Sequence, residues 1–214
     1  MVLIRTHLKR LKRRLLRRKN RPFLVIGLFA VLILSVALYS SLMSKHIDPS
    51  AYQGLLDTIA ASESSGNYNA YFANSANTEL RLTHMSVAEV VQWQKEYVRA
   101  GQPSNAVGRY QIIQPTLEGL VKEMRLPSST TFNEIIQDTM AIRLMERRGA
   151  VEFVKGNLSA EEFAANLAKE WAALPRITGD NPSVSFYAGD GLNASRISVD
   201  AMLGAVKEFK KTAE

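Results

Sequence analysis

Residues 60–72 read AASESSGNYNAYF, and this stretch decides the fold because a helical run ends within it. From Leu55 onward, apolar residues recur on one helical face, which predicts a first helix running to about Ser62. Beyond it, Gly, Asn, Ser and Tyr collect and the helical period is lost. One carboxylate, Glu63, therefore stands where the predicted helix gives way to a turn.

The position of Glu63 allows a catalytic interpretation and a structural one. The unsatisfied carbonyls at a helix C-terminus carry a partial negative charge, which disfavours an ionised carboxylate. If apolar neighbours also cover the side chain, both effects raise its pKa toward the value that a general acid needs near neutral pH. The alternative is an exposed helix-end residue, which is the more common identity of a Glu in an isolated Glu-Ser pair.

A second stretch, AVGRYQIIQPT at residues 106–116, carries groups suited to a carbohydrate ligand. Gly108 allows a backbone to approach a ligand closely. Tyr110 offers a ring face and a hydroxyl, and the Gln111 amide can bond both donors and acceptors of a sugar. The Pro-Thr pair ending at Thr116 predicts the start of another helix. A place in the core is the alternative for Tyr110.

Three further helices are predicted from capping boxes, in which a Ser or Thr hydroxyl and a Glu three residues later satisfy the first free amides. The boxes pair Ser86 with Glu89, Thr131 with Glu134, and Ser159 with Glu162, and these helices are expected to end at Gly101, Gly149 and Pro175. A last helix is predicted for residues 199–210, while residues 67–83 and 102–114 are predicted as loops or short strands. The expected fold is mainly α (α+β): one helical domain at residues 51–214 with a small β or irregular insertion.

The segment before this domain predicts a membrane anchor. Residues 23–43 contain no charge, and 21 residues at about 1.5 Å each approach the hydrocarbon thickness of a bilayer. A cleaved signal peptide is the alternative, but its apolar region is usually shorter, about 7–15 residues. Basic residues concentrated before this helix predict a single-pass protein with its N-terminus in the cytoplasm and residues after Ser44 outside. Residues 44–50 are predicted to be a linker.

The net charge of +7 belongs to the N-terminal tail at residues 1–22. Ten of the 27 Lys and Arg residues precede Pro22, so residues 22–214 carry 17 basic against 20 acidic side chains. An amphipathic tail lying against anionic lipid is expected, and nucleic-acid binding is the alternative. There is no Cys, and the three His residues lack metal-ligand spacing, so neither a metal nor another cofactor is expected.

The order of the motifs resembles a known family. Glu before Ser and Gly, then G-x-Y-Q some 45 positions later, then Pro-Thr, is similar to the lysozyme-like superfamily that includes soluble lytic transglycosylases. The segments AVGRYQII, FNEIIQDTMAIRLMERRGAVEFVKGNL and FAANLAKEWAALPRITG resemble successive parts of the lambda-type phage endolysin, a lytic transglycosylase of peptidoglycan. The resemblance extends from about Tyr52 to Lys211. It implies a lysozyme-like fold and a catalytic acid at Glu63, but its soluble pattern includes neither the anchor nor the basic tail.

The predicted site combines this resemblance with the residue chemistry. Glu63 is the predicted catalytic residue, and the predicted substrate-binding residues are Ser64, Gly108, Tyr110, Gln111 and Tyr187. The resemblance implies that Tyr110 and Gln111 line the glycan groove. Tyr187 belongs to the loop PRITGDNPSVSFYAGDG at residues 175–191, which is the second candidate for a groove wall. Trp171 is expected in the core near that loop. Asp57 is expected on a solvated helix face, and Gln137 with Asp138 are expected to tie a helix to a loop.

A single carboxylate is sufficient for the reaction that the resemblance implies. The Glu protonates the glycosidic oxygen after N-acetylmuramic acid, and its carboxylate then takes the proton from that sugar's C6 hydroxyl, which closes a 1,6-anhydro ring. A hydrolytic muramidase, the first alternative, usually needs a second carboxylate about 5–9.5 Å away, and Glu79 is the candidate. An inactive wall-binding or assembly module is the second alternative. The expected setting is local wall penetration by a phage, for genome delivery or lysis, with virion or envelope-complex proteins as further partners.

Overall fold

The computed structural model describes residues 47–214. The predicted basic tail, the predicted transmembrane helix and residues 44–46 of the predicted linker lie outside these residues. Among the residues that are described, none of the helices has the length and apolar character needed to cross a membrane. The anchor at residues 23–43 and the orientation derived from it therefore stay predictions.

The first helix of the domain extends past its predicted end near Ser62 and includes Glu63. A short 3-10 helix, η2 (Pro49–Tyr52), leads directly into α3 (Gln53–Ser64). Helix α3 ends because Ser65 adopts a left-handed conformation with φ of 56°, and the Gly66 N–H then bonds the Ala60 carbonyl. Glu63 is consequently held in the last helical turn, where its backbone position is fixed.

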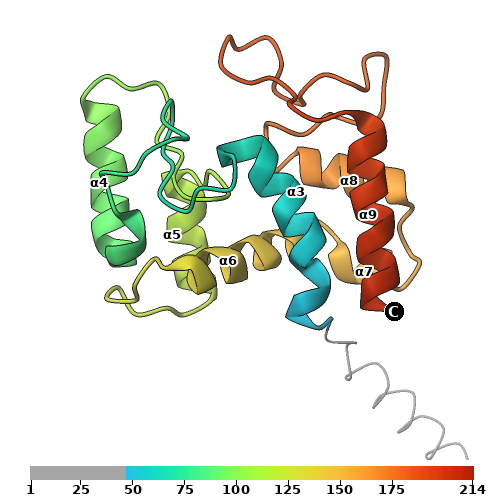
Figure 1. The fold of residues 1–214 in the computed structure, drawn as a ribbon, viewed down its shortest axis with the longest axis horizontal. Helices are drawn as coiled ribbons and strands as arrows, with labels where there is room; N and C mark the ends of the chain where they lie inside the picture. The colour runs from blue at the N-terminus through green and yellow to red at the C-terminus, as the bar shows by residue number, and fades with distance from the viewer. Residues whose placement is uncertain (1–46) are drawn as a thin grey trace, which may run out of the picture. The chain divides into compact units, whose positions relative to one another are not determined.

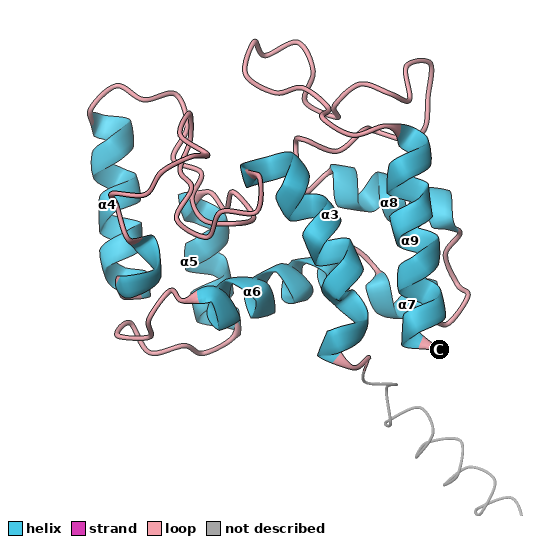
Figure 2. Ribbon diagram, in the orientation of Figure 1, coloured by secondary structure: helices cyan, strands magenta, loops and turns pink. Residues whose placement is uncertain are grey.

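Six more α-helices and the 3-10 helix η3 (Leu82–His84) follow along the described chain, and helices and loops make up almost all of it (Figure 2). The α-helices are α4 (Val87–Arg99), α5 (Gln114–Glu123), α6 (Glu134–Arg147), α7 (Ala150–Val154), α8 (Ala160–Ala168) and α9 (Val199–Ala213). A mainly helical fold was predicted and is confirmed, and it is consistent with a lysozyme-like domain. The short helix α7 was not predicted, because its five residues are too few to establish a period.

Two of the three capping boxes are confirmed and one prediction is wrong. Ser86 and Ser159 cap α4 and α8, each with the Glu three residues later bonded back to the cap. Helix α6 is capped instead by Asn133, whose side chain accepts from the Ile136 N–H. Thr131 cannot serve because it forms an isolated β-bridge with Ser86, which holds it in extended conformation before the helix begins.

The prediction that Pro175 ends the helix begun at Ser159 is also wrong. Helix α8 stops at Ala168, seven residues earlier. Beyond it, the Ala173 N–H donates to the Glu63 carboxylate rather than to a carbonyl one helical turn back. The helix therefore does not extend to Pro175, because the Ala173 backbone amide bonds Glu63 on α3.

The predicted β element is absent from residues 47–214, where pairing between extended segments is limited to isolated bridges. The region after α3 is irregular because asparagine side chains take the place of a strand ladder. Asn77 donates to the carbonyls of Asn69 and Leu80, at 2.6 and 2.7 Å. Asn69 in turn accepts from the Thr83 N–H at 2.9 Å. The insertion is thus an irregular loop, one of the two forms that were expected, and the β contribution to the fold class is wrong.

The helices form two groups joined by α6 (Figure 1). Helices α4 and α5 pack on each other, while α9 packs against both α3 and α8, and α6 contacts α3 and α7. One continuous apolar core runs through the domain. Aromatic rings fill its larger part, with Tyr52 and Phe209 4.8 Å apart and Phe153 stacked on Phe163 at 4.9 Å. This core fixes the C-terminal end of α3 relative to the loops around it.

Candidate active site

An open cleft of about 700 Å³ lies beside the C-terminal end of α3. Loops at residues 71–75 and 104–113 supply part of its lining, and residues 169–172 with residues 187–196 of the later loop supply another part. Glu63 belongs to the lining as well. Segments that are far apart in the sequence thus meet around one carboxylate.

Glu63 has the environment of a proton donor. Its Oε1 accepts a hydrogen bond from the Ala173 N–H at 3.0 Å. Burial raises the pKa of the Glu63 carboxyl from its ordinary 4.5 to about 7, although the Ala173 amide and the positive charge of Arg196 both act to lower it. At neutral pH the protonated and ionised forms are therefore both populated, which suits a group that first gives and then takes a proton.

A second carboxylate lines the cleft, but it is engaged in an ion pair. Glu170 accepts from Arg148, with Oε2 at 2.7 Å from Nη2 and 2.8 Å from Nε. The predicted second candidate, Glu79, is exposed in the irregular loop and is not part of the cleft lining. Among the described residues, Glu63 is the carboxylate of this cleft that has no salt bridge.

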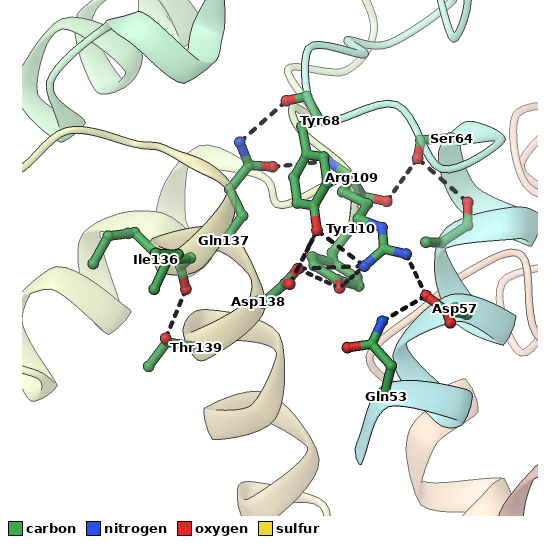
Figure 3. Close-up of polar contacts among 12 residues, drawn as sticks. Gln53, Asp57, Ser64, Tyr68, Arg109, Tyr110, Ile136, Gln137, Asp138 and Thr139 are labelled. Atoms are coloured by element: carbon green, nitrogen blue, oxygen red, sulfur yellow. Dashed lines mark hydrogen bonds and ion pairs between the residues drawn. The ribbon is translucent and has the colours of Figure 1, made fainter. Parts of the chain in front are cut away.

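Behind the cleft, Arg109 joins three segments of the chain (Figure 3). Its guanidinium donates to Asp57 on α3 at 2.5 Å, to Tyr68 in the irregular loop at 3.1 Å, and to the hydroxyl of Tyr110 at 2.8 Å. The Tyr110 hydroxyl donates to Asp138 on α6 at 2.6 Å. Asp57 is about half exposed, as expected, but it is also paired with Arg109. This network holds the turn at residues 108–111 between α3 and α6.

Gln137 and Asp138 confirm their predicted role of tying a helix to neighbouring loops. The Gln137 side chain accepts from the Arg109 N–H at 2.9 Å and donates to the carbonyls of Tyr68 and Phe132. Figure 3 shows Gln137 and Asp138 projecting from α6 toward Tyr68 and Arg109.

Two predicted substrate-binding residues lie behind the cleft wall. Ser64 is fully buried, and its hydroxyl donates to the Arg109 carbonyl at 2.7 Å. Gly108 has φ of +75°, and a Cβ there would lie 2.3 Å from the side-chain oxygen of Gln137. The close neighbour that requires glycine at this position is therefore Gln137 rather than a ligand. Both residues position the wall, and neither is part of the cleft lining.

The other predicted residues line the cleft in different ways. Tyr110 is buried, and its hydroxyl donates to Asp138. It is therefore a core residue that also forms part of the cleft wall. Gln111 lies in a left-handed conformation, with its amide donating to the Gly108 carbonyl at 2.9 Å. Tyr187 is 41% exposed and donates from its hydroxyl to the Lys169 carbonyl at 2.7 Å. Trp171 is buried as expected, and its indole N–H donates to the Tyr110 carbonyl.

Several cleft residues were missed by the sequence analysis. Tyr71 lines the cleft and packs edge-on against Trp93, which itself stacks on Tyr97 at 4.6 Å between ring centroids. Arg196, which lines the cleft, was also missed, and so was Ala173, which is outside the lining but bonds Glu63. An aromatic spacing of four residues within the predicted helix after Ser86 could have indicated the stacked pair, but no local signal marks Ala173, because its backbone amide makes the contact.

The residues described here hold no cluster of three His, Cys, Asp or Glu side chains that could bind a metal ion. A half-buried carboxyl in an open cleft, with its pKa raised toward neutral pH, is an arrangement suited to general acid–base chemistry.

Comparison with known proteins gives the family. The Endolysin family model matches residues 53–188, which is more than half of the chain, and the protein belongs to the Endolysin family. It is therefore a phage-type enzyme that degrades the cell wall, with peptidoglycan as its substrate. Neither a curated protein nor a solved structure matches the chain.

Proposed function

We propose that the protein is a lytic transglycosylase that cleaves the bond between N-acetylmuramic acid and N-acetylglucosamine, with Glu63 as its catalytic residue. The observation that carries this proposal is the Glu63 carboxyl, half-buried in a cleft wall with a pKa of about 7 and bonded to the Ala173 amide. A carboxyl with this pKa serves as an acid and as a base in one catalytic cycle.

The reaction needs two proton transfers at the same carboxyl. Protonated Glu63 gives its proton to the glycosidic oxygen as the bond to the muramic acid C1 breaks. The Glu63 carboxylate then accepts the proton of the C6 hydroxyl, whose oxygen bonds C1 and closes the 1,6-anhydro ring. The Ala173 N–H at 3.0 Å stabilises the carboxylate between these steps, and no water is consumed.

The state of the second cleft carboxylate favours transglycosylation over hydrolysis. A hydrolase needs a free carboxylate as nucleophile or as the base that activates water. Glu170 is held by two contacts to Arg148, and Glu79 is exposed outside the cleft. A hydrolytic muramidase is accordingly the alternative outcome of the test rather than the first expectation.

The proposed location rests on the sequence before residue 47. Residues 23–43 would anchor the enzyme in a membrane, with the N-terminus on the cytoplasmic side and the catalytic domain facing the wall. The basic tail at residues 1–22 would contact anionic lipid or nucleic acid. Anchoring would confine cleavage to wall near the membrane, which suits local penetration by a phage or its virion.

The test is the mass of the released products. Full-length protein in mild detergent is incubated with purified peptidoglycan, beside the variants Glu63→Gln and Glu79→Gln. Anhydro products, each lighter by one water than the hydrolytic ones, are expected from the unmodified protein and from Glu79→Gln, but not from Glu63→Gln. Hydrated products would replace the transglycosylase with a muramidase, and absence of cleavage by the unmodified protein would indicate a wall-binding module.

A further inference from the structure

The cleft and the domain around it differ in the sign of their charge. Residues 47–214 carry 16 basic and 20 acidic side chains, a balance of −4. The cleft lining nevertheless includes three basic side chains, Arg148, Lys169 and Arg196, against the two carboxyls of Glu63 and Glu170. With Glu63 protonated, as catalysis requires, the cleft has a balance of +2. A local positive charge on an acidic domain indicates an anionic ligand at this place.

Two of these three cations form no salt bridge in the described part of the chain, although the charge of Arg196 acts on the Glu63 carboxyl. Arg148 is neutralised by Glu170, at 2.7 Å. Lys169 donates only to the neutral side chain of Asn166, at 3.2 Å, and the Arg196 guanidinium donates only to the Ser62 carbonyl, at 3.5 Å. Both residues are exposed, so their charges are accessible from the cleft.

These two residues line the same cleft as Glu63, and each is held through its backbone. The Arg196 N–H donates to the Ala173 carbonyl at 2.9 Å, and Ala173 is the residue whose N–H bonds Glu63. The Lys169 carbonyl accepts from the Tyr187 hydroxyl at 2.7 Å. A ligand held by Lys169 and Arg196 therefore lies beside the sugar that Glu63 protonates.

We propose that Lys169 and Arg196 bind the carboxylates of the peptide stem carried by muramic acid, so that the enzyme prefers stem-bearing glycan. The inference rests on the proposed function. The glycosidic bond and the sugar hydroxyls are neutral, whereas the stem attached to the muramic acid lactyl group ends in ionised carboxylates. These carboxylates are opposite in charge to Lys169 and Arg196, two cations of the cleft that form no salt bridge.

The expected effect is moderate because both cations are exposed. Charge contacts between exposed groups contribute little each, so the loss of both should lower the preference for stem-bearing substrate by about 3- to 20-fold. The contribution should weaken as salt rises from low to physiological concentration, where the screening length falls to about 8 Å. Neutral contacts to sugar would not show that salt dependence.

The experiment compares two substrates with the full-length protein. One is intact peptidoglycan, and the other is the same material after an amidase has removed the peptide stems. The unmodified protein, the double variant Lys169→Gln with Arg196→Gln, and the control Lys207→Gln are compared by the ratio of their rates on the two substrates. Lys207 is an exposed α9 lysine outside the cleft, so its replacement removes one positive charge, half of the change in the double variant, without touching the site.

A ratio that falls in the double variant and is unchanged in the control would support the proposal. An equal loss on both substrates would overturn it, because the two side chains would then serve the fold or Glu63 rather than the stem. Cleavage of neither substrate by the unmodified protein would overturn the proposed function instead, together with this inference. Binding provides a second readout, in which Glu63→Gln protein should retain a soluble stem-bearing disaccharide more tightly than the stem-free one.

Discussion

Replacing Gly108 by alanine tests whether the turn at residues 108–111 depends on close packing against α6. A Cβ at this position would lie 2.3 Å from the Gln137 side-chain oxygen and 3.2 Å from the Phe132 ring, so the Gln137 side chain must move. Its bonds to the Arg109 N–H and to the Tyr68 carbonyl would then be lost. The positive φ adds strain for any side chain.

The expected cost is the sum of two effects. Left-handed backbone in a residue with a Cβ costs about 1–2 kcal/mol. An Arg109 N–H left buried without an acceptor costs about 1–3 kcal/mol. Gly108→Ala should therefore lower the free energy of unfolding by about 2–5 kcal/mol.

Urea unfolding of the full-length protein, followed by tryptophan fluorescence, measures this change. Both tryptophans, Trp93 and Trp171, lie in the described domain and report on it. The matched control is Gly204→Ala within α9, where a Cβ would meet nothing within 4 Å. That exposed helical substitution should stabilise the protein by about 0.5–1 kcal/mol. A loss smaller than about 1 kcal/mol for Gly108→Ala would refute the role assigned to Gln137.

Three further predictions concern Glu63 and its neighbours. Initial rates on peptidoglycan should fall as pH rises through about 7, where Glu63 loses its proton. The variant Arg196→Gln should move this decline to higher pH, because it removes a cation that lowers the pKa of Glu63. A decline at the same pH in the variant would contradict the role of Arg196. The pKa of Glu63 is about 7 in the folded protein, against an ordinary 4.5, so folding is accompanied by proton uptake between pH 4.5 and pH 7. The free energy of unfolding should therefore fall as pH rises from about 4.5 to 7. Urea unfolding at pH 4 and at pH 8 should accordingly show that Glu63→Gln gains up to about 3 kcal/mol at the higher pH only, and an equal gain at both would contradict it. Ser64→Ala should lose about 1–3 kcal/mol in thermal or urea unfolding, since it leaves the buried Arg109 carbonyl without its donor, and a neutral result would show that water replaces the hydroxyl.

The sequence predicted those parts of the fold that depend on local chemistry. Ser86 and Ser159 were found as helix caps because both partners of a capping box lie within four residues. Thr131 failed the same test because it forms a bridge with Ser86, a partner 45 positions away. The end of α8 was misplaced for a similar reason, since Ala173 leaves the helical pattern to bond Glu63 across 110 positions.

In the candidate site, too, the sequence indicated the residues but not the distant contacts that decide where each one lies. Glu63, Gln111 and Tyr187 were named from residue chemistry and resemblance, and each lines the cleft. Gly108 and Ser64 were named for ligand contact, which stays a prediction; in the structure they lie against Gln137 and the Arg109 carbonyl, outside the cleft lining. A sequence motif points to the residues of a site, but it does not distinguish residues that contact the ligand from residues that hold the cleft wall in place.

The bond between the Ala173 amide and Glu63 has a consequence for how the family can vary. A backbone N–H is present in every amino acid except proline, so the contact at 3.0 Å imposes no side-chain chemistry on residue 173. The residue is only 4% exposed, which restricts its size. Across endolysins of this type, residue 173 should therefore vary among small amino acids while never becoming proline, and a search for invariant side chains would pass over a direct hydrogen-bond partner of Glu63, the proposed catalytic acid.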